Sequence, residues 1–185
     1  MKSKRCFRFL FLLVLGSFSA WAGIVTNGGF ETGDFSGWTR SGNLSYTYIW
    51  GVSPHSGEWH AAFGPVGSYG YISQTLATVP GTYYDFSFWE AHDQGFPAEV
   101  WWDGNLVYNL AAAPGDWTQI TVNGLLATTS STVLMLGFRN DPSYTWVDDI
   151  DVVPSGAQIP EPSTFLLGGL GLAALAASKL LARKA

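Results

Sequence analysis

The stretch Thr82-Tyr83-Tyr84-Asp85-Phe86-Ser87-Phe88-Trp89 alternates along its length between two kinds of side chain. Successive residues of a β-strand point to opposite faces. One face therefore carries Tyr84, Phe86 and Phe88, whereas the other carries Tyr83, the polar residues and Trp89. The pattern predicts a strand that buries its first face in a core and turns its second face outward.

Similar strand-like runs recur on both sides of this stretch, and no long helical period interrupts them. The hairpin signal Asp103-Gly104 separates two of them, with Val100 and Trp102 expected to face the core, and Asn123-Gly124 predicts a second turn. About nine strands predict an all-β fold, an antiparallel jelly-roll β-sandwich. The other runs are Ser45–Trp50, His60–Phe63, Tyr69–Leu76, Ala98–Trp102, Asn105–Leu110, Thr118–Val122, Thr132–Arg139 and Thr145–Val153.

The charges are distributed unevenly along the chain. Residues 23–178 contain two basic residues, Arg40 and Arg139, and all 14 acidic residues of the protein. Such a surface repels phosphate backbones, which argues against nucleic-acid binding, and it suits divalent cations and neutral ligands. The single cysteine, Cys6, precedes the first apolar run, so a processed chain would contain no thiol.

The N-terminal residues predict a removable signal peptide over residues 1–22. Residues 2–8 are basic, Phe9–Phe18 is a short apolar run, and Ala20-Trp21-Ala22 offers an A-x-A cleavage site before Gly23. The alternative is a membrane anchor. An apolar run of this length is too short to cross about 30 Å of hydrocarbon.

The C-terminal end predicts a membrane helix with a basic tail. Thr164–Ala182 contains 19 residues, which as a helix would measure about 28 Å. The cations Lys179, Arg183 and Lys184 place the C-terminus in the cytoplasm and the body outside. The predicted organisation is a signal peptide (1–22), a β-sandwich domain (23–153), a linker (154–159) and a sorting segment (160–185).

The last 27 or so residues resemble the PEP-CTERM sorting signal. The resemblance rests on Pro160-Glu161-Pro162, the following apolar helix and the basic pair Arg183-Lys184, in that order. It implies processing by an exosortase, a membrane-embedded cysteine peptidase, in a Gram-negative bacterium that makes exopolysaccharide. The alternative is a generic C-terminal anchor.

A second resemblance covers about 125 residues of the body. Asn27–Trp38 looks like the opening of galactose-binding-like and carbohydrate-binding jelly rolls, and Val147-Asp148-Asp149-Ile150 looks like their closing strand. Ser56-Gly57 and Pro80-Gly81-Thr82-Tyr83 fit at intermediate positions. The resemblance implies the fold more strongly than any ligand, because this fold serves many functions.

The same resemblance implies a structural calcium ion that ties the first strand to the last. Its expected ligands are Glu31, the Ser56 to Glu58 region, and Asp148 or Asp149. Simple alternation places Asp148 with Trp146 and Ile150 on the core side, where a carboxylate needs a partner or a metal. The alternative is a surface acid cluster, or acids that serve caps and turns.

Aromatic side chains form a candidate carbohydrate site. Flat rings stack on sugars while acids and amides hold hydroxyl groups. Trp89 and Trp101 are expected to face outward on two strands, beside Glu99 and Asp85, and the further candidates are Trp50, Trp59, Tyr69 and Tyr71. The alternative is that these rings fill the core or cover its rim.

Nothing in the sequence predicts catalysis, a catalytic residue or an organic cofactor. His55, His60 and His92 are interpreted as loop histidines that bind no metal, since no H-E-x-x-H motif is present. A glycosidase would need two carboxylates at a set separation across a cleft, and the sequence offers only unpaired candidates, Glu90, Asp93, Glu99 and Asp103. We therefore expect a protein that is not an enzyme.

The leading hypothesis is an exported surface or matrix protein, sorted by an exosortase and tethered by its C-terminal helix, whose sandwich is a candidate binder of exopolysaccharide. One alternative is a structural surface protein without a sugar site. The least favoured alternative is a glycan-active enzyme. The expected partners are the exosortase, extracellular polysaccharide and the membrane, with calcium as the candidate cofactor.

Overall fold

The computed structural model describes residues 23–93, 98–110 and 115–156. The predicted signal peptide, sorting segment and membrane helix lie outside the described residues. Within the described ranges, no helix is long and apolar enough to cross a membrane. The described residues belong to one compact unit.

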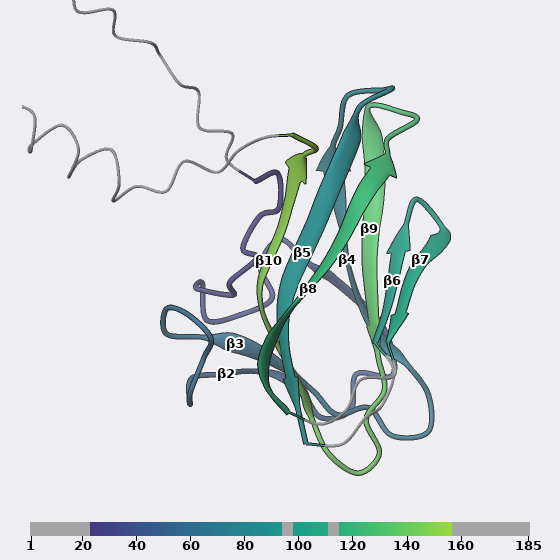
Figure 1. Cartoon of the computed structure of the whole chain (residues 1–185). Helices are drawn as coiled ribbons and strands as arrows, with labels where there is room; N and C mark the ends of the chain where they lie inside the picture. The colour runs from purple at the N-terminus through teal and green to yellow at the C-terminus, as the bar shows by residue number, and fades with distance from the viewer. Residues whose placement is uncertain (1–22, 94–97, 111–114, 157–185) are drawn as a thin grey trace, which may run out of the picture. The chain divides into compact units, whose positions relative to one another are not determined.

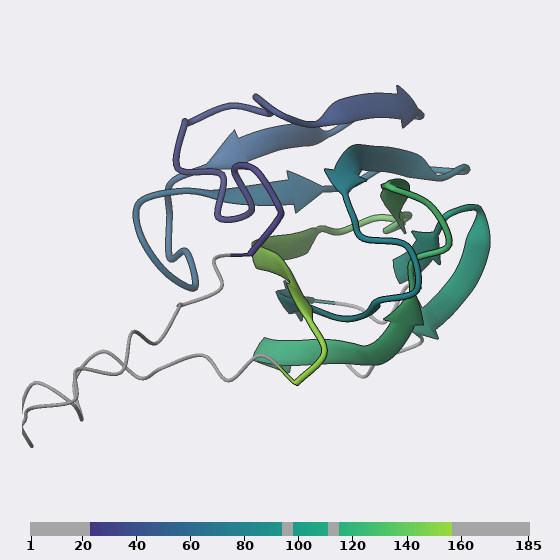
Figure 2. The same ribbon diagram turned by 90° about the horizontal axis from the view of Figure 1, so that it is seen from above.

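The described residues form two five-stranded antiparallel sheets packed face to face (Figures 1 and 2). Sheet A has the order β1-β4-β9-β6-β7, and sheet B has the order β2-β3-β10-β5-β8. This architecture confirms the predicted all-β antiparallel fold. The strands are β1 (Thr39–Gly42), β2 (Thr47–Trp50), β3 (His60–Phe63), β4 (Gly70–Ala77), β5 (Tyr83–His92), β6 (Ala98–Trp102), β7 (Asn105–Leu110), β8 (Gly115–Leu126), β9 (Ser131–Phe138) and β10 (Thr145–Pro154).

Nine of these strands, β2 to β10, coincide with predicted runs, and the bounds of β3, β6 and β7 agree to the residue. Strand β1 was not predicted. Its sequence, Thr-Arg-Ser-Gly, is exposed at every position and contains no apolar alternation. It forms by pairing with Gly70–Ser73 at the edge of sheet A, so its existence depends on a neighbour that is distant in the sequence.

The two predicted turns had different outcomes. Asp103 and Gly104 connect β6 to β7 with φ angles of 49° and 79°, as a two-residue hairpin of this type requires. The turn predicted at Asn123-Gly124 is wrong, because both residues lie inside β8. There the pairing slips between Tyr84 and Phe86 of β5 and forms a bulge. Gly124 accommodates it with a φ of 73°.

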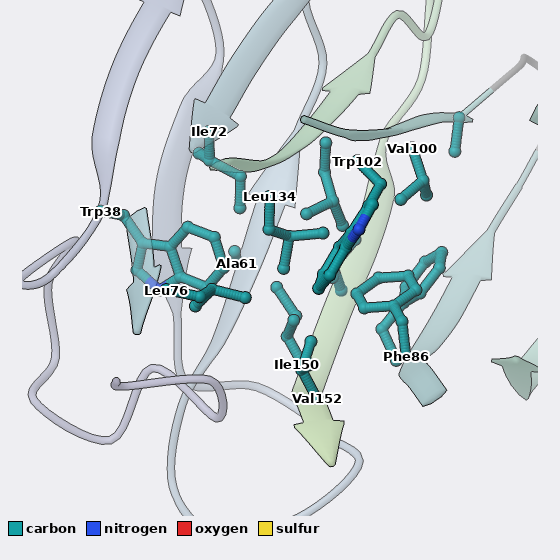
Figure 3. Packing of buried hydrophobic residues seen from close by; sticks show 14 of the residues in the cluster. Trp38, Ala61, Ile72, Leu76, Phe86, Val100, Trp102, Leu134, Ile150 and Val152 are labelled. Carbon is teal, nitrogen blue, oxygen red and sulfur yellow. The ribbon is translucent and has the colours of Figure 1, made fainter. Parts of the chain in front are cut away.

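The core lies between the sheets and confirms the predicted faces (Figure 3). Phe86, Phe88 and Val100 are completely buried, and Trp102 is 3% exposed. Phe63 and Phe138 stack across the interior, with ring centroids 4.3 Å apart. Burying each such side chain stabilises the fold by roughly 1.5–3 kcal/mol. Since the core is enclosed by strands of residues 23–156 alone, we expect this fragment to fold by itself.

Strand β10 departs from simple alternation, which makes the predicted placement of Asp148 wrong. A bulge shifts the register between Asp148 and Asp151, and Asp149 adopts a φ of 48°. Val147 and Ile150 consequently face the core, whereas Trp146 lines a pocket on the outer side of sheet B. Asp148 pairs with Trp89 in the neighbouring strand and is buried without joining the apolar core.

Candidate carbohydrate and metal sites

A pocket of about 720 Å³ opens on the outer face of sheet B. All five strands of the sheet contribute to it, because their ends or edges meet there. The volume falls within the range of small-molecule sites. Its lining consists of Trp50, Val52, Ser53, His60, Ala91, His92, Asp93, Gly115, Asp116, Trp117 and Trp146.

Small neighbours leave space around the large ring of Trp146. This residue pairs with Ala62 of β3 on one side and with Ala91 of β5 on the other. Trp50, at the end of β2, is 43% exposed, while Trp146 and Trp117 are half-buried. Three indole rings from three strands therefore surround one hollow.

Trp117 is held in place by a hydrogen bond to a loop. Its Nε1 donates to the carbonyl oxygen of Ser53 at 3.2 Å. The ring also meets His55 and His60 edge-on, with centroid distances of 5.8 Å and 5.5 Å. The loop that precedes β3 is thereby attached to β8, the outermost strand of the sheet.

Two buried histidines line the pocket, and each has a ring nitrogen with no hydrogen-bond partner among the described residues. His60 is 1% exposed and His92 is 6% exposed. Within the described residues, Nδ1 of His60 and Nε2 of His92 have no partner, whereas Nδ1 of His92 lies beside the carboxylate of Glu90. An unsatisfied buried polar group costs about 1–3 kcal/mol, so a ligand hydroxyl in the pocket would satisfy atoms that the protein leaves unpaired. Burial lowers the pKa of His60, which keeps its ring neutral at physiological pH.

A carboxyl group lies beneath the pocket on the inner face of β5. Glu90 is 2% exposed, and its Oε1 lies 3.2 Å from Nδ1 of His92. Burial raises the pKa of Glu90 to about 7. The pKa of Tyr108 is raised by burial and by the nearby Glu90. These groups form a polar cluster at one end of the otherwise apolar interior.

Acidic side chains flank the pocket, and no arginine is among the described residues that line it. Asp93 and Asp116 are exposed at its rim, and Asp93 accepts a hydrogen bond from Ser143 at 3.0 Å. The two arginines have partners elsewhere, since Arg139 pairs with an aspartate at 2.8 Å and Arg40 lies over the ring of Phe35.

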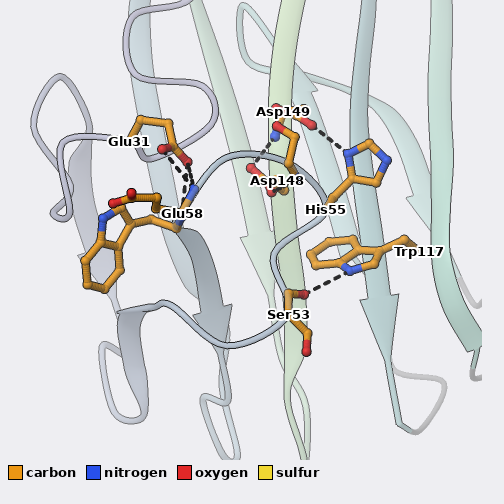
Figure 4. A network of polar contacts seen from close by, with 9 residues as sticks. Glu31, Ser53, His55, Glu58, Trp117, Asp148 and Asp149 are labelled. Atoms are coloured by element: carbon orange, nitrogen blue, oxygen red, sulfur yellow. Dashed lines mark hydrogen bonds and ion pairs between the residues drawn. The ribbon is translucent and has the colours of Figure 1, made fainter.

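A second polar cluster lies beside the pocket (Figure 4). His55, Asp148 and Asp149 offer possible ligand atoms that all lie within 4.8 Å of one another. Nδ1 of His55 lies 2.6 Å from Oδ2 of Asp149. Ser56 donates its main-chain N–H to Asp148 at 3.1 Å and its hydroxyl to Asp149 at 2.8 Å. Burial, aided by the charge of Asp149, raises the pKa of Asp148 to about 6 against the opposing effect of these main-chain hydrogen bonds.

Glu31 is joined to the same loop by main-chain hydrogen bonds. Its carboxylate accepts from the N–H groups of Glu58 at 3.0 Å and Trp59 at 3.1 Å. The side chain of Glu58 is exposed, so this residue contributes its backbone to the arrangement. Figure 4 shows Glu31 and Glu58 on one side of the two aspartates and His55 on the other.

The space over Gly29 is bordered by three acidic side chains. A methyl group on Gly29 would lie 3.3 Å from Oδ1 of Asp149, and 3.7 Å from both Oδ1 of Asp148 and Cγ of Glu31. The structure therefore brings the predicted calcium residues Asp148 and Asp149 together beside Gly29, with the Cγ methylene of Glu31 nearby and with His55 paired to Asp149. Carboxylate oxygens are the ligands that calcium prefers, and the donor set fits that ion.

The predicted carbohydrate residues are spread over both sheets. Trp50 lines the pocket, and Trp89 lies beside it, stacked on His55 at a centroid distance of 3.8 Å. Trp59 packs near Gly33 and Gly51. Asp85 accepts hydrogen bonds from Gly124 and Ser155 and holds the bulge of β8.

Glu99 and Trp101 belong to β6 of sheet A, so the structure does not bring them together with Trp89. Trp101 donates from Nε1 to Glu99 at 3.2 Å. Tyr71 lies close over Gly137 on the same face and stacks with Tyr69. The pKa of Tyr69 is raised by burial and by Glu99. Each of these rings thus has a partner within its own face.

Sequence reasoning missed Trp117 and Trp146 and misplaced two histidines. Trp117 lies just before the predicted start of its strand, and Trp146 was assigned to the core by alternation. His60 begins β3, in agreement with the predicted run His60–Phe63, and His92 ends β5. The interpretation of both as loop histidines is therefore wrong. His60 pairs with Trp50 between β3 and β2. The spacing of five residues between His55 and His60 is the sequence signal that places both histidines in one region.

Comparison with known proteins identifies the C-terminal segment. Residues 158–184 match the PEP-CTERM protein-sorting motif. This match confirms the predicted sorting signal and contains Pro160-Glu161-Pro162. The PEP-CTERM motif implies processing by an exosortase, export, and a cell-surface or membrane-associated location in a Gram-negative bacterium.

Solved structures of carbohydrate-binding modules share the fold. The module TmCBM61, in complex with β-1,4-galactotriose, is 20% identical, has a TM-score of 0.61, and aligns over 72% of this chain and 99% of its own. A family 16 carbohydrate-binding module is 21% identical, with a TM-score of 0.53 and coverage of 70% and 99%. The xylan-binding CBM22-1 domain of Paenibacillus barcinonensis Xyn10C is 16% identical, with a TM-score of 0.55 and coverage of 76% and 100%. At these identities the likeness shows the fold alone. A comparison with curated proteins finds no match.

Proposed function

We propose that this chain is a PEP-CTERM-sorted surface protein whose β-sandwich binds extracellular polysaccharide in the pocket of sheet B. The observation that carries the proposal is the meeting of Trp50, Trp117 and Trp146 with the unpartnered nitrogens of His60 and His92 in one hollow. Large rings provide flat apolar contacts for sugar rings, and a few polar atoms fix orientation.

The mechanism of binding requires no chemical step. The rings of Trp117 and Trp146 would contact the apolar faces of successive sugars. His60 and His92 would exchange hydrogen bonds with hydroxyl groups, which removes the cost of their unpaired nitrogens. The neighbouring structures that bind galactotriose and xylan support this assignment by fold. Weak binding suffices at a surface, because many tethered copies act together.

Affinity measurements on residues 23–156 test the proposal. Titration calorimetry with neutral polysaccharides, such as a β-1,4-galactan and a xylan, should detect binding by at least one. Trp117→Ala should weaken that binding at least tenfold. Trp101→Ala, on the opposite sheet, is the matched control and should leave it within twofold. Equal effects of the two variants would contradict the pocket assignment, and no binding by any polysaccharide would favour the structural alternative.

The two ends of the chain account for how the protein would reach the cell surface. Residues 1–22 would be removed on export, and Thr164–Ala182 would hold the protein in the membrane until an exosortase reads Pro160-Glu161-Pro162. Replacing Glu161 by Ala should block sorting and leave export intact. Cell fractionation measures both, and unchanged surface delivery of the variant would count against recognition of this motif.

A calcium ion is the proposed occupant of the cluster around Gly29. Asp148, Asp149 and Glu31 would hold it through carboxylate oxygens, as the resemblance of the sequence implies. The ion would neutralise the carboxylates of Asp148 and Asp149, whose possible ligand atoms lie within 4.8 Å of each other. Its role would be structural, joining the N-terminal segment and the loop before β3 to the closing strand.

A further inference from the structure

The charge of the pocket carries information about its ligand. Asp93 and Asp116 flank the pair formed by His92 of β5 and Gly115 of β8, and both line the hollow. Neither arginine of residues 23–156 lines it, and this span contains no lysine. An anionic ligand would therefore meet like charges with no compensating cation.

The hydrogen-bonding groups of the pocket also favour a cationic ligand. Aspartate oxygens only accept hydrogen bonds, and a neutral histidine offers one acceptor nitrogen. Burial lowers the pKa of His60 and so favours its neutral ring, and its Nδ1 has no partner among the described residues. An ammonium group donates three hydrogen bonds and accepts none, which matches a pocket rich in acceptors.

The indole rings add a third contribution. A cation that lies over the face of a tryptophan is attracted by the ring quadrupole, and the attraction grows when water is excluded. Trp117 and Trp146 are half-buried walls of the pocket. A sugar that carries an ammonium group would use the same rings for stacking and for this attraction.

On these grounds we propose that the pocket selects a polysaccharide containing amino sugars with free ammonium groups, a partly deacetylated hexosamine polymer, over neutral and uronic-acid polymers. This inference rests on the proposed function, since it specifies the ligand of the same pocket. It assigns to Asp93 and Asp116 the recognition of the ammonium group.

Three oligosaccharides of equal length test the inference: a glucosamine pentamer, its fully N-acetylated counterpart and a galacturonate pentamer. Calorimetry on residues 23–156, at about pH 6 and low salt, should give at least tenfold tighter binding of the glucosamine pentamer than of the N-acetylated one. The galacturonate pentamer should not bind. The preference should shrink as salt is added, because exposed charges are screened.

A double variant assigns the preference to residues. In Asp93→Asn/Asp116→Asn, the ratio of the two affinities should fall to about one. Asp103→Asn, in the exposed hairpin between β6 and β7, removes a similar charge elsewhere and should keep the ratio. A thermal melt of each variant confirms that it is folded.

The outcomes separate this inference from the proposed function. Equal binding of the glucosamine and N-acetylated pentamers, or tighter binding of galacturonate, overturns the amino-sugar preference while the pocket remains a sugar site. A preference that survives in Asp93→Asn/Asp116→Asn also overturns the assignment. Failure of every oligosaccharide and polysaccharide to bind overturns the proposed function itself.

Discussion

The outer faces of the two sheets carry similar residues and differ in what these residues do. On sheet A, Trp101 donates to Glu99, and Tyr71 lies over Gly137. On sheet B, the rings of Trp117 and Trp146 border an open hollow. Among the described residues, the first face pairs its ring donor with a carboxylate, whereas the second leaves Nδ1 of His60 and Nε2 of His92 without partners.

This difference shows that aromatic content alone does not locate a binding site. The hollow of sheet B exists because alanines flank Trp146 in both neighbouring strands. On sheet A, Tyr71 occupies the space that Gly137 leaves free. A site requires rings, unsatisfied polar atoms and empty volume at the same place, and the following four predictions test whether sheet B alone meets that condition.

The largest difference should appear when a buried acid below sheet B is compared with an acid on sheet A. Burial raises the pKa of Glu90 to about 7 in the folded state, above its ordinary value of 4.5. Folding therefore becomes less favourable as the pH rises from 4.5 to 7, by up to about 3 kcal/mol above that range. Glu90→Gln should remove this loss, so urea unfolding should show a gain at pH 8 that is absent near pH 4.

Glu99→Gln is the matched control for that measurement. Glu99 is partly exposed beside Trp101, so its replacement should change the free energy of unfolding by less than about 0.5 kcal/mol at either pH. A wild-type stability that does not fall between pH 4 and pH 8 would contradict the expected effect of Glu90.

Calcium should stabilise the domain through the cluster beside sheet B. An ion that binds only the folded state, present at a hundred times its Kd, adds about 2.7 kcal/mol. The melting temperature should rise with calcium and fall with a chelator, and Asp149→Asn should abolish the response. Asp103→Asn on the side of sheet A should retain it, and a response that persists in Asp149→Asn would disprove the assigned ligand.

Filling the hollow should make sheet B behave like sheet A. Ala91→Leu places extra carbon atoms on the pocket floor beside Trp146, where Ala91 is 8% exposed. Sugar affinity should fall about tenfold, or 1.4 kcal/mol, while the melting temperature changes little. Calorimetry and a thermal melt of the same sample separate the two effects, and unchanged affinity would mean that the floor is not in contact with ligand.

The smallest effect concerns the bulge that shapes sheet B. Gly124 has a φ of 73° and donates its N–H to Asp85 at 2.9 Å. Gly124→Ala should cost about 1 kcal/mol, because a side chain disfavours this backbone conformation. Gly115→Ala, at the start of the same strand, meets nothing within 4 Å and should cost less. Equal losses in chemical denaturation would indicate that the bulge is not strained.

The sequence determined the strands more fully than it determined the site. Alternation was sufficient to predict the two faces of β5, where Phe86 and Phe88 face the core. The hairpin signal was sufficient to predict the turn at Asp103-Gly104. Alternation failed in β10, because the positive φ at Asp149 and the bulge change the phase of the strand. Neither feature has a local signature in a sequence without glycine at that position.

The pocket was beyond sequence reasoning for a different reason. Trp50, Trp117 and Trp146 are far apart in the chain, and they meet only because the sheet has the order β2-β3-β10-β5-β8. Trp89 and Trp101 looked equivalent in the sequence, yet their strands belong to different sheets. Strand order depends on long-range pairing, which residue spacing does not reveal.

The contacts of Trp117 and His55 link the proposed calcium site to the proposed sugar pocket through a continuous series of side chains. Asp149 lies against His55, the His55 ring meets Trp117, and Trp117 meets His60 in the pocket. If both ligands bind as proposed, thermodynamic reciprocity applies: whatever factor calcium contributes to sugar affinity, sugar must contribute to calcium affinity. The adhesion of such a protein to its matrix would then depend on the ionic composition outside the cell.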